Sequence, residues 1–374
     1  MNLKKTSSIF LIIIFSLFTA FLVTYNLKKL LFTSQDLKVL GFLPYWNMTG
    51  DYQVDFKKID QLIYFSLMVN ELGDFDQTDP GFTNFYSEKL DNLIRQAKEN
   101  NKQVLLCIAS FDAEVMYQVT LNPEIRKKLI DNIIWALQEK NFDGVDIDFE
   151  YFWQVDHEEV FGDNFNIFLE ELKKAMNEIN PQLILSVDIY PKAIIENYPY
   201  KFTKLNQISD QIIIMAYDYT VSIAPHAGPI APIETDFRLQ IEDNYSIVQT
   251  IKALPNKISL KKAFLGIPLY GYEWQTIDKE HRSQVVGGKG ETILYGKTEA
   301  LIKEKNPQIN WDSLAQSPWL VYEENRLYYQ LYFENPESLK VKYRVTGNSG
   351  LEGIAFWALG YEAEINEVWD LFKK

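Results

Sequence analysis

The chain contains a single cysteine, Cys107, among 374 residues, so no disulfide bond within it can stabilise the fold. Its stability must therefore come from a hydrophobic core. Histidine is almost as scarce, and His157, His226 and His281 include no pair at the spacing of metal ligands. The sequence thus predicts no metal site and no cofactor.

Positive charge is also in short supply, because 37 Lys and Arg face 51 Asp and Glu, a formal net charge of −14. Most of such a surface would repel a polyanion, which disfavours a nucleic-acid partner. Two motifs are missing as well: no GxGxxG follows the first predicted strand, and no GxSxG nucleophile elbow occurs. These absences disfavour a dinucleotide-binding enzyme and a serine hydrolase.

An apolar run without any charge covers residues 9–25, with two lysines on either side of it. Its 17 residues lie at the lower edge for a spanning helix, and no small-x-small cleavage site follows. We therefore expect residues 1–36 to be an uncleaved membrane anchor with a short linker, and the rest of the chain to lie outside the cytoplasm. A cleaved signal, which would give a secreted protein, is the alternative.

Beyond this segment, short apolar runs alternate with amphipathic stretches, which is typical of parallel βαβ units. Eight runs are predicted as strands, at residues 41–46, 61–68, 103–110, 142–149, 183–190, 211–217, 263–270 and 353–358. Apolar residues recur every three to four positions in the stretches predicted as helices, 87–100, 123–140 and 165–179. This alternation predicts an α/β fold, a closed (β/α)8 TIM barrel over residues 37–374, with a doubly wound open sheet as the alternative.

The gap between the last two predicted strands is too long for a single crossover. It contains strand-like runs of its own at residues 319–323 and 326–333. The sequence therefore predicts a small α+β insertion over residues 275–350, on the rim of the barrel. We expect the protein to be a monomer.

The stretch DGVDIDFE, residues 143–150, carries the strongest chemical signal. Alternate side chains of a strand share a face, so Asp146, Asp148 and Glu150 point the same way. They lie about 7 Å apart along a strand, where two like charges repel by about 2.4 kcal/mol at an effective dielectric of 20. At least one should hold a proton near neutral pH, as a general acid must. Glu150, at the strand end, is the expected proton donor, and the alternatives are a solvated acidic edge or a cation site.

With this stretch the chain resembles glycoside hydrolase family 18, the chitinases and related endo-N-acetylglucosaminidases, whose motif is DGxDxDxE. Further motifs follow in the family's order: GFLPYW at 41–46, MAYDY at 215–219, FLGIPLYGYEW at 264–274 and GIAFWALGYE at 353–362. The resemblance implies a glycosidase that cleaves β-1,4 bonds next to N-acetylglucosamine in chitin, chitooligosaccharide or peptidoglycan. It also implies substrate-assisted retention, in which the acetamido carbonyl of the sugar is the nucleophile.

The resemblance also implies a role for each matched residue. Glu150 would protonate the glycosidic oxygen, Asp148 would orient the acetamido N–H, and Asp146 would share a proton with Asp148. Tyr217 would hydrogen-bond the acetamido oxygen. The other matched residues would bind the substrate: Trp357 as the floor beneath the sugar, with Met215, Asp218 and Tyr270. For Met215, packing inside the barrel is an equally good interpretation.

The third predicted strand departs from the family, since Cys107, Ile108, Ala109 and Ser110 stand where SxGG is common. A thiol is a weaker donor than a hydroxyl, so we expect a changed rate and pH optimum. The run SVDIYPK at 186–192 is similar to the branch of spore-cortex and cell-wall N-acetylglucosaminidases, which favours peptidoglycan. A non-catalytic glycan-binding protein on the same barrel is the alternative function, disfavoured because Glu150 is present.

Overall fold

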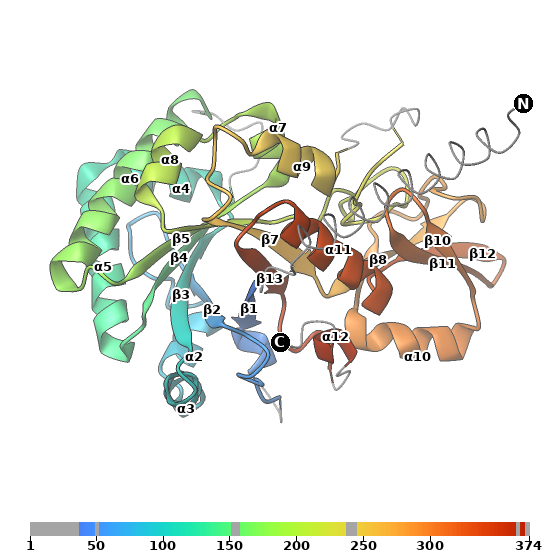
Figure 1. Cartoon of the computed structure of the whole chain (residues 1–374), viewed down its shortest axis with the longest axis horizontal. Coiled ribbons are helices and arrows are strands. Elements are labelled where there is room, and N and C mark those ends of the chain that lie inside the picture. Colours follow the sequence, from blue (N-terminus) through green and yellow to red (C-terminus); the bar gives the residue numbers. More distant parts are fainter. Residues whose placement is uncertain (1–36, 49–51, 151–157, 237–244, 364–366, 371–374) are drawn as a thin grey trace, which may run out of the picture. The chain divides into compact units, whose positions relative to one another are not determined.

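The computed structural model describes residues 37–48, 52–150, 158–236, 245–363 and 367–370, and Lys38 onward forms one compact unit. Eight parallel strands close into a barrel in the order β1-β13-β7-β6-β5-β4-β3-β2 (Figure 1). Their bounds are β1 Lys38–Pro44, β2 Gln61–Met68, β3 Gln103–Ser110, β4 Gly144–Phe149, β5 Ile184–Ile189, β6 Gln211–Ile214, β7 Ala263–Pro268 and β13 Gly353–Trp357. The predicted TIM barrel is confirmed, and the open sheet is wrong because β1 pairs with β13 as well as β2.

Two strand ends differ from their predicted positions. The strand β6 ends at Ile214, not at residue 217, because its ladders with β5 and β7 stop there. The N–H groups of Ala216 and Tyr217 then donate to the nearby carbonyls of Ile214 and Met215. Tyr270, predicted as the end of the seventh strand, is instead the first residue of β8 in a second sheet, since β7 ends at Pro268.

The helices of the barrel follow its strands and cover them on the outside (Figure 1). Their bounds are η1 Tyr45–Asn47, α2 Pro80–Phe85, α3 Glu88–Glu99, α4 Ala113–Leu121, α5 Pro123–Lys140, α6 Glu158–Ile179, α7 Pro191–Glu196, α8 Phe202–Ile208, α9 Ile247–Ala253, α11 Pro336–Asn348 and α12 Glu367–Asp370. Helix α5 has the predicted bounds because the Asn122 side chain caps its first turn, with Pro123 as its first residue. Helix α6 begins before the predicted residue 165, since Phe161 is buried and stacks on Phe165 at 5.4 Å.

A second sheet is inserted between β7 and β13. It is antiparallel, in the order β10-β11-β12-β8-β9. Its elements are β8 Tyr270–Thr276, β9 Glu291–Leu294, α10 Tyr295–Lys305, β10 Gln308–Asp312, β11 Ser317–Glu324 and β12 Leu327–Tyr332. Leu301 and Ile302 of α10 pack against the buried Leu320 and Leu331 of this sheet. The two strand-like runs of the sequence thus correspond to β11 and β12.

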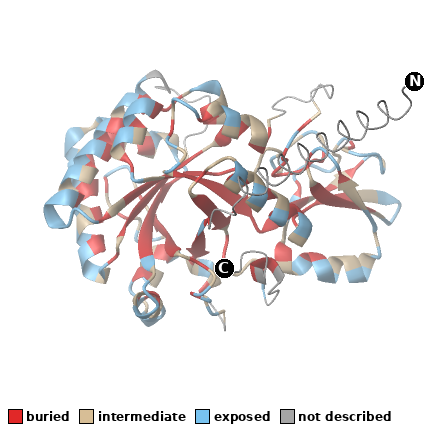
Figure 2. Ribbon diagram, viewed as in Figure 1, coloured by how far each residue is buried: buried red, intermediate tan, exposed pale blue. Residues whose placement is uncertain are grey.

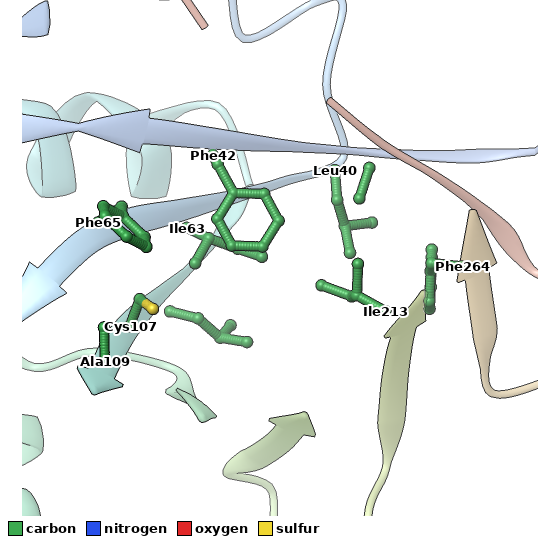
Figure 3. Packing of buried hydrophobic residues seen from close by; sticks show 10 residues of the cluster. Leu40, Phe42, Ile63, Phe65, Cys107, Ala109, Ile213 and Phe264 are labelled. Atoms are coloured by element: carbon green, nitrogen blue, oxygen red, sulfur yellow. The ribbon is translucent and has the colours of Figure 1, made fainter. Parts of the chain in front are cut away.

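Buried residues concentrate on the barrel strands, whereas the outer helices alternate buried and exposed faces (Figure 2). Inside the barrel, one side is filled by apolar groups: Leu40, Phe42, Ile63, Phe65, Leu105, Cys107, Ala109, Ile213, Phe264 and Ala355 (Figure 3). Most of these come from β1, β2 and β3. The polar interior residues described below lie on the next two strands of the barrel, β4 and β5.

Within the described ranges, every helix is too short or too polar to cross a bilayer. The run predicted as a membrane anchor, residues 9–25, lies outside those ranges.

Candidate active site

The strand β4 holds the predicted acids on its inner face. Its outer face packs on α6, where the ring of Phe149 stacks on Phe168 at 5.6 Å. Asp146 and Asp148 are 0% and 3% exposed, and the half-buried Glu150 follows the strand, its N–H donating to the Ser110 carbonyl at 3.0 Å. The apolar outer face fixes the strand's orientation, so the three carboxyl groups enter the barrel.

A cavity of about 730 Å³ opens above these acids, at the carboxyl ends of the strands. It brings together residues that are far apart in the sequence. Seven of the eight predicted site residues line it: Asp148, Glu150, Met215, Tyr217, Asp218, Tyr270 and Trp357. Asp146 does not line the cavity, because it lies deeper on β4 and is fully buried.

Neighbouring residues fix the position of the Glu150 side chain and shift its pKa. The phenol of Tyr190 donates a hydrogen bond to Glu150 Oε2. Burial raises the pKa of Glu150 to about 7, the Tyr190 hydrogen bond opposes this rise, and the charge of Asp218 adds to it. A carboxyl group with such a pKa is protonated in a large fraction of molecules near neutral pH, as a general acid requires.

The two aspartates beneath Glu150 are also perturbed. Burial, together with the charges of Glu150 and Asp146, raises the pKa of Asp148 well above its usual range. Burial raises the pKa of Asp146 to about 6, against the lowering effect of Ser186, Cys107 and Asp188 as nearby donors. Neither oxygen of Asp146 accepts a hydrogen bond of ordinary geometry from the described residues. The group formed by Asp146, Asp148 and Glu150 therefore carries protons as well as negative charge.

Strand β5 contributes residues that the sequence analysis missed. Ser186 and Asp188 are 0% and 4% exposed and share the inward face with Tyr190, which reaches Glu150. Asp188 lines the cavity and adds a carboxyl group beside those of Asp146, Asp148 and Glu150. The alternation Ser-Val-Asp-Ile-Tyr was the available signal, since it puts three polar side chains on one face of a strand.

No cation of the described residues pairs with these acids. Among the ion pairs of the described residues, none involves Asp146, Asp148, Glu150 or Asp188. Nor do the described residues contain a group of three or more His, Cys, Asp and Glu arranged to hold a metal ion. The acidic array is therefore compensated by protons and by neutral donors.

A second group of polar residues lies across the cavity, after β6. The Asp218 carboxylate accepts hydrogen bonds from Tyr270 at 2.5 Å and Tyr272 at 3.1 Å. The rings of Tyr217 and Tyr270 meet edge to face at 6.3 Å. Burial raises the pKa of Tyr217, so its phenol stays protonated and can donate to a ligand oxygen. Asp218 thus aligns the tyrosine wall, besides facing the cavity as predicted.

Aromatic rings gather at the ends of β13, β1, β2 and β3. Trp357 contacts Phe65 at 4.7 Å and Phe42 at 5.7 Å, and its ring lies 6.5 Å from that of Trp46. Trp46 and Phe111 are 40% and 43% exposed. Flat apolar faces of this kind suit the apolar faces of sugar rings. The sequence analysis predicted only Trp357 of this group.

Cys107, the departure noted on the third strand, lies directly beside Asp146 in the parallel register of β3 and β4. It is fully buried in the apolar side of the barrel, near Phe65 and Ala109 (Figure 3). Burial, with the charge of Asp146 next, raises the pKa of the thiol, which keeps its proton. Cys107 is therefore a weak donor toward Asp146.

The sequence matches the family model described as glycosyl hydrolases family 18 over residues 38–362. The chain belongs to glycosyl hydrolases family 18. The matched region spans the whole barrel and the inserted sheet. Residues 38–362 therefore form a glycosidase domain of this family.

Curated relatives agree with this membership, and solved structures share the fold. A cortical fragment-lytic enzyme of Bacillus anthracis is 24% identical over 261 residues, covering 67% of this chain and 54% of the relative. A Bacillus cereus spore cortex-lytic enzyme aligns with a TM-score of 0.72 at 19% identity, over 91% of this chain and 74% of that one. An Ostrinia furnacalis Group IV chitinase with allosamidin aligns with a TM-score of 0.77 at 21% identity, over 90% and 98%. These structural likenesses show the shared fold alone. The family 18 chain spans a little over half the length of the first curated relatives, 56% and 54%.

Proposed function

We propose that this family 18 domain hydrolyses β-1,4 bonds next to N-acetylglucosamine, with Glu150 as general acid and base. The observation that supports this most directly is the position of Glu150 at the cavity, with a pKa of about 7 and no cation partner among the described residues. Such a group donates a proton near neutral pH and recovers it afterwards.

In the proposed reaction the leaving oxygen takes the Glu150 proton while the sugar's acetamido carbonyl attacks its own anomeric carbon. Asp148 accepts a hydrogen bond from the acetamido N–H, and the Tyr217 phenol donates one to the acetamido oxygen. Water then opens the cyclic intermediate, and its proton returns to Glu150. The configuration at the anomeric carbon is retained because inversion occurs twice.

Peptidoglycan is the substrate that we favour over chitin. Three curated relatives are cortical fragment-lytic enzymes, from Bacillus anthracis, Bacillus cereus and Bacillus subtilis. The exposed Trp46 and Phe111 beside Trp357 extend the aromatic surface beyond the cavity, which favours a glycan longer than one sugar. An extracytoplasmic location, through an anchor at residues 9–25, would bring the domain to such a substrate.

The test is to incubate the full chain, in detergent, with peptidoglycan and with chitooligosaccharides, following new reducing ends. Glu150→Gln is the matched control, since it keeps the side-chain shape without an ionisable proton. Cleavage that the control loses supports the proposal and identifies the glycan. Binding without cleavage at any pH would instead support the glycan-binding alternative. Fractionation of cells that express the full chain, or a chain lacking residues 1–36, tests the anchor.

A further inference from the structure

Strand β5 places three polar side chains against the acids of β4. The parallel register pairs Asp146 with Ser186 and Ile147 with Val187. One inward step further along both strands sets Asp188 beside Asp148, and the phenol of Tyr190 then reaches Glu150. The acids on and after β4 therefore face a parallel row of polar groups on and after β5, to which the family resemblance assigns no role.

Asp188 is the unusual member of this row, because it is itself an acid. It is 4% exposed, and its Oδ1 has no hydrogen-bond partner among the described residues. The titratable groups around it are acids, a thiol and phenols: Asp146 and Asp148 of β4, Glu150 after that strand, Cys107 of β3, and Tyr217 and Tyr200. Two carboxyl groups can hydrogen-bond only when one of them carries a proton.

We propose that Asp188 is a positioning residue that remains protonated and, with a small adjustment of its side chain, donates its O–H to the Asp146 carboxylate, whose oxygens accept no ordinary hydrogen bond from the described residues in this structure. Asp146 is then the ionised member at the floor of the site, and Asp148 and Glu150 above it keep protons for the reaction. The pKa shifts of the two aspartates support this assignment of protonated and ionised groups. Burial and the charges of Asp146, Asp148 and Glu150 raise the pKa of Asp188 well above its usual range. For Asp146, in contrast, Asp188 acts as a donor and opposes the rise in pKa that burial causes.

The inference rests on the proposed glycosidase activity, and it goes beyond it by assigning a role to a residue outside the motif. Asp188 acts through Asp146, so its removal should change the pH dependence of the reaction as well as its rate. Without the Asp188 donor, the Asp146 carboxylate is harder to form and ionises only at higher pH.

The first test measures kcat/KM against pH for Asp188→Ala and Asp188→Asn in the full chain, on the glycan that the wild type cleaves. Asp188→Ala should lower kcat by about tenfold or more and move the acidic limb to higher pH. Asparagine is neutral and its amide can donate to Asp146, so Asp188→Asn should recover most of the rate and the position of the limb. Equal losses in both variants would overturn the proposal, because Asp188 would then need to ionise. An unmoved acidic limb in Asp188→Ala would overturn it as well.

A second test does not depend on activity. A folded-state pKa above the unfolded one means that Asp188 destabilises the fold increasingly as pH rises above its unfolded pKa, about 3.9. Asp188→Asn should therefore be more stable than the wild type in thermal unfolding, by a margin that grows with pH from about 4 upward. A margin that does not grow would contradict a protonated Asp188. If the wild type cleaves no glycan, the proposed activity fails while this test still decides the state of Asp188.

Val187→Ala is the matched control on the same strand. Its side chain is buried on the outward face, away from the acids. It should lower stability by a similar amount at every pH and leave the acidic limb in place. A shift of that limb in Val187→Ala would show that any disturbance of β5 moves it, which would overturn the assignment to Asp188.

Discussion

Buried acids lie in two different surroundings in this protein. In the barrel, Asp146, Asp148 and Asp188 are almost completely buried, and no cation from the described part of the chain pairs with them. Outside the barrel, Asp312 of β10 is paired with Arg282 at 3.2 Å and His281 at 3.0 Å. Likewise Glu334, which follows β12, is paired with the fully buried Lys342 of α11 at 2.7 Å.

This difference shows how burial can serve either stability or chemistry. Burial alone would raise the pKa of Asp312, but hydrogen bonds from His281 and Ala315 and the charge of Arg282 outweigh it and lower that pKa. Asp312 is therefore a permanent anion that joins elements of the second sheet. The described residues give the barrel acids no such cations, and burial raises the pKa of each of them.

The largest expected effect is on activity. Glu150→Gln should reduce kcat by about 10²–10⁴-fold, because the proton donor is lost. Its free energy of unfolding should not fall, since an uncompensated buried acid is replaced by a neutral amide. Rate assays and urea unfolding of the same preparation check both statements. Retained activity, or a destabilised variant, would break the contrast between the two surroundings.

Breaking the buried ion pair between Lys342 and Glu334 should, in contrast, lower the stability of the fold. Lys342→Ala should lower the free energy of unfolding by about 3–5 kcal/mol, because Glu334 is left buried and uncompensated. Urea unfolding measures this loss. The double variant Lys342→Met, Glu334→Leu removes both charges and serves as the control, and it should recover most of the stability. A single variant as stable as the double one would show that the ion pair is not what holds α11 in place.

The pH dependence of stability should have opposite signs for Glu150 and Asp312. Glu150 has a raised folded pKa, so the advantage of Glu150→Gln over the wild type should grow by about 1–3 kcal/mol between pH 4.5 and 7. Asp312 has a lowered folded pKa and stabilises the fold above its unfolded pKa. The cost of Asp312→Asn should therefore be largest near neutral pH and shrink below about pH 4. Thermal unfolding across this range checks both slopes, and equal slopes would refute the distinction.

Tyr190→Phe tests the tuning of the acid with a smaller effect. The phenol lowers the pKa of Glu150 through its hydrogen bond, so its removal should raise that pKa. The basic limb of kcat/KM should then move to higher pH by up to about 1 unit. A limb that moves to lower pH, or not at all, would show that Tyr190 does not hold the proton donor.

The smallest effect is expected from Cys107→Ser. A hydroxyl donates more strongly than a thiol, so serine should lower the pKa of Asp146, which lies beside it. The acidic limb should move to lower pH by a few tenths of a unit, about 0.5 kcal/mol or less. A larger shift would show that Cys107, which stands where the family commonly has serine, controls the pH optimum more strongly than the residues of β5 do.

Much of the barrel follows from local patterns in the sequence. The predicted bounds of β2, β3 and α5 match the structure, because continuous apolar runs and the Asn122-Pro123 start are local signals. The early end of β6 and the start of β8 at Tyr270 could not be predicted, since each depends on where the neighbouring strand stops pairing. The roles assigned to Glu150, Asp148, Asp146 and Tyr217 remain predictions for the variants above.

By itself the sequence determined the alternation that builds the barrel and the row of acids in DGVDIDFE, because both depend on the period of a single strand. Only the tertiary structure decided which groups face those acids. The alternation Ser-Val-Asp-Ile-Tyr puts Asp188 and Tyr190 on one face of a strand, but only the parallel register of β4 and β5 sets them beside Asp148 and Glu150. The same is true of the cations, which among the described residues pair with Asp312 and Glu334 but not with the barrel acids. A pKa depends on neighbours in space and on burial, and neither is encoded at one position.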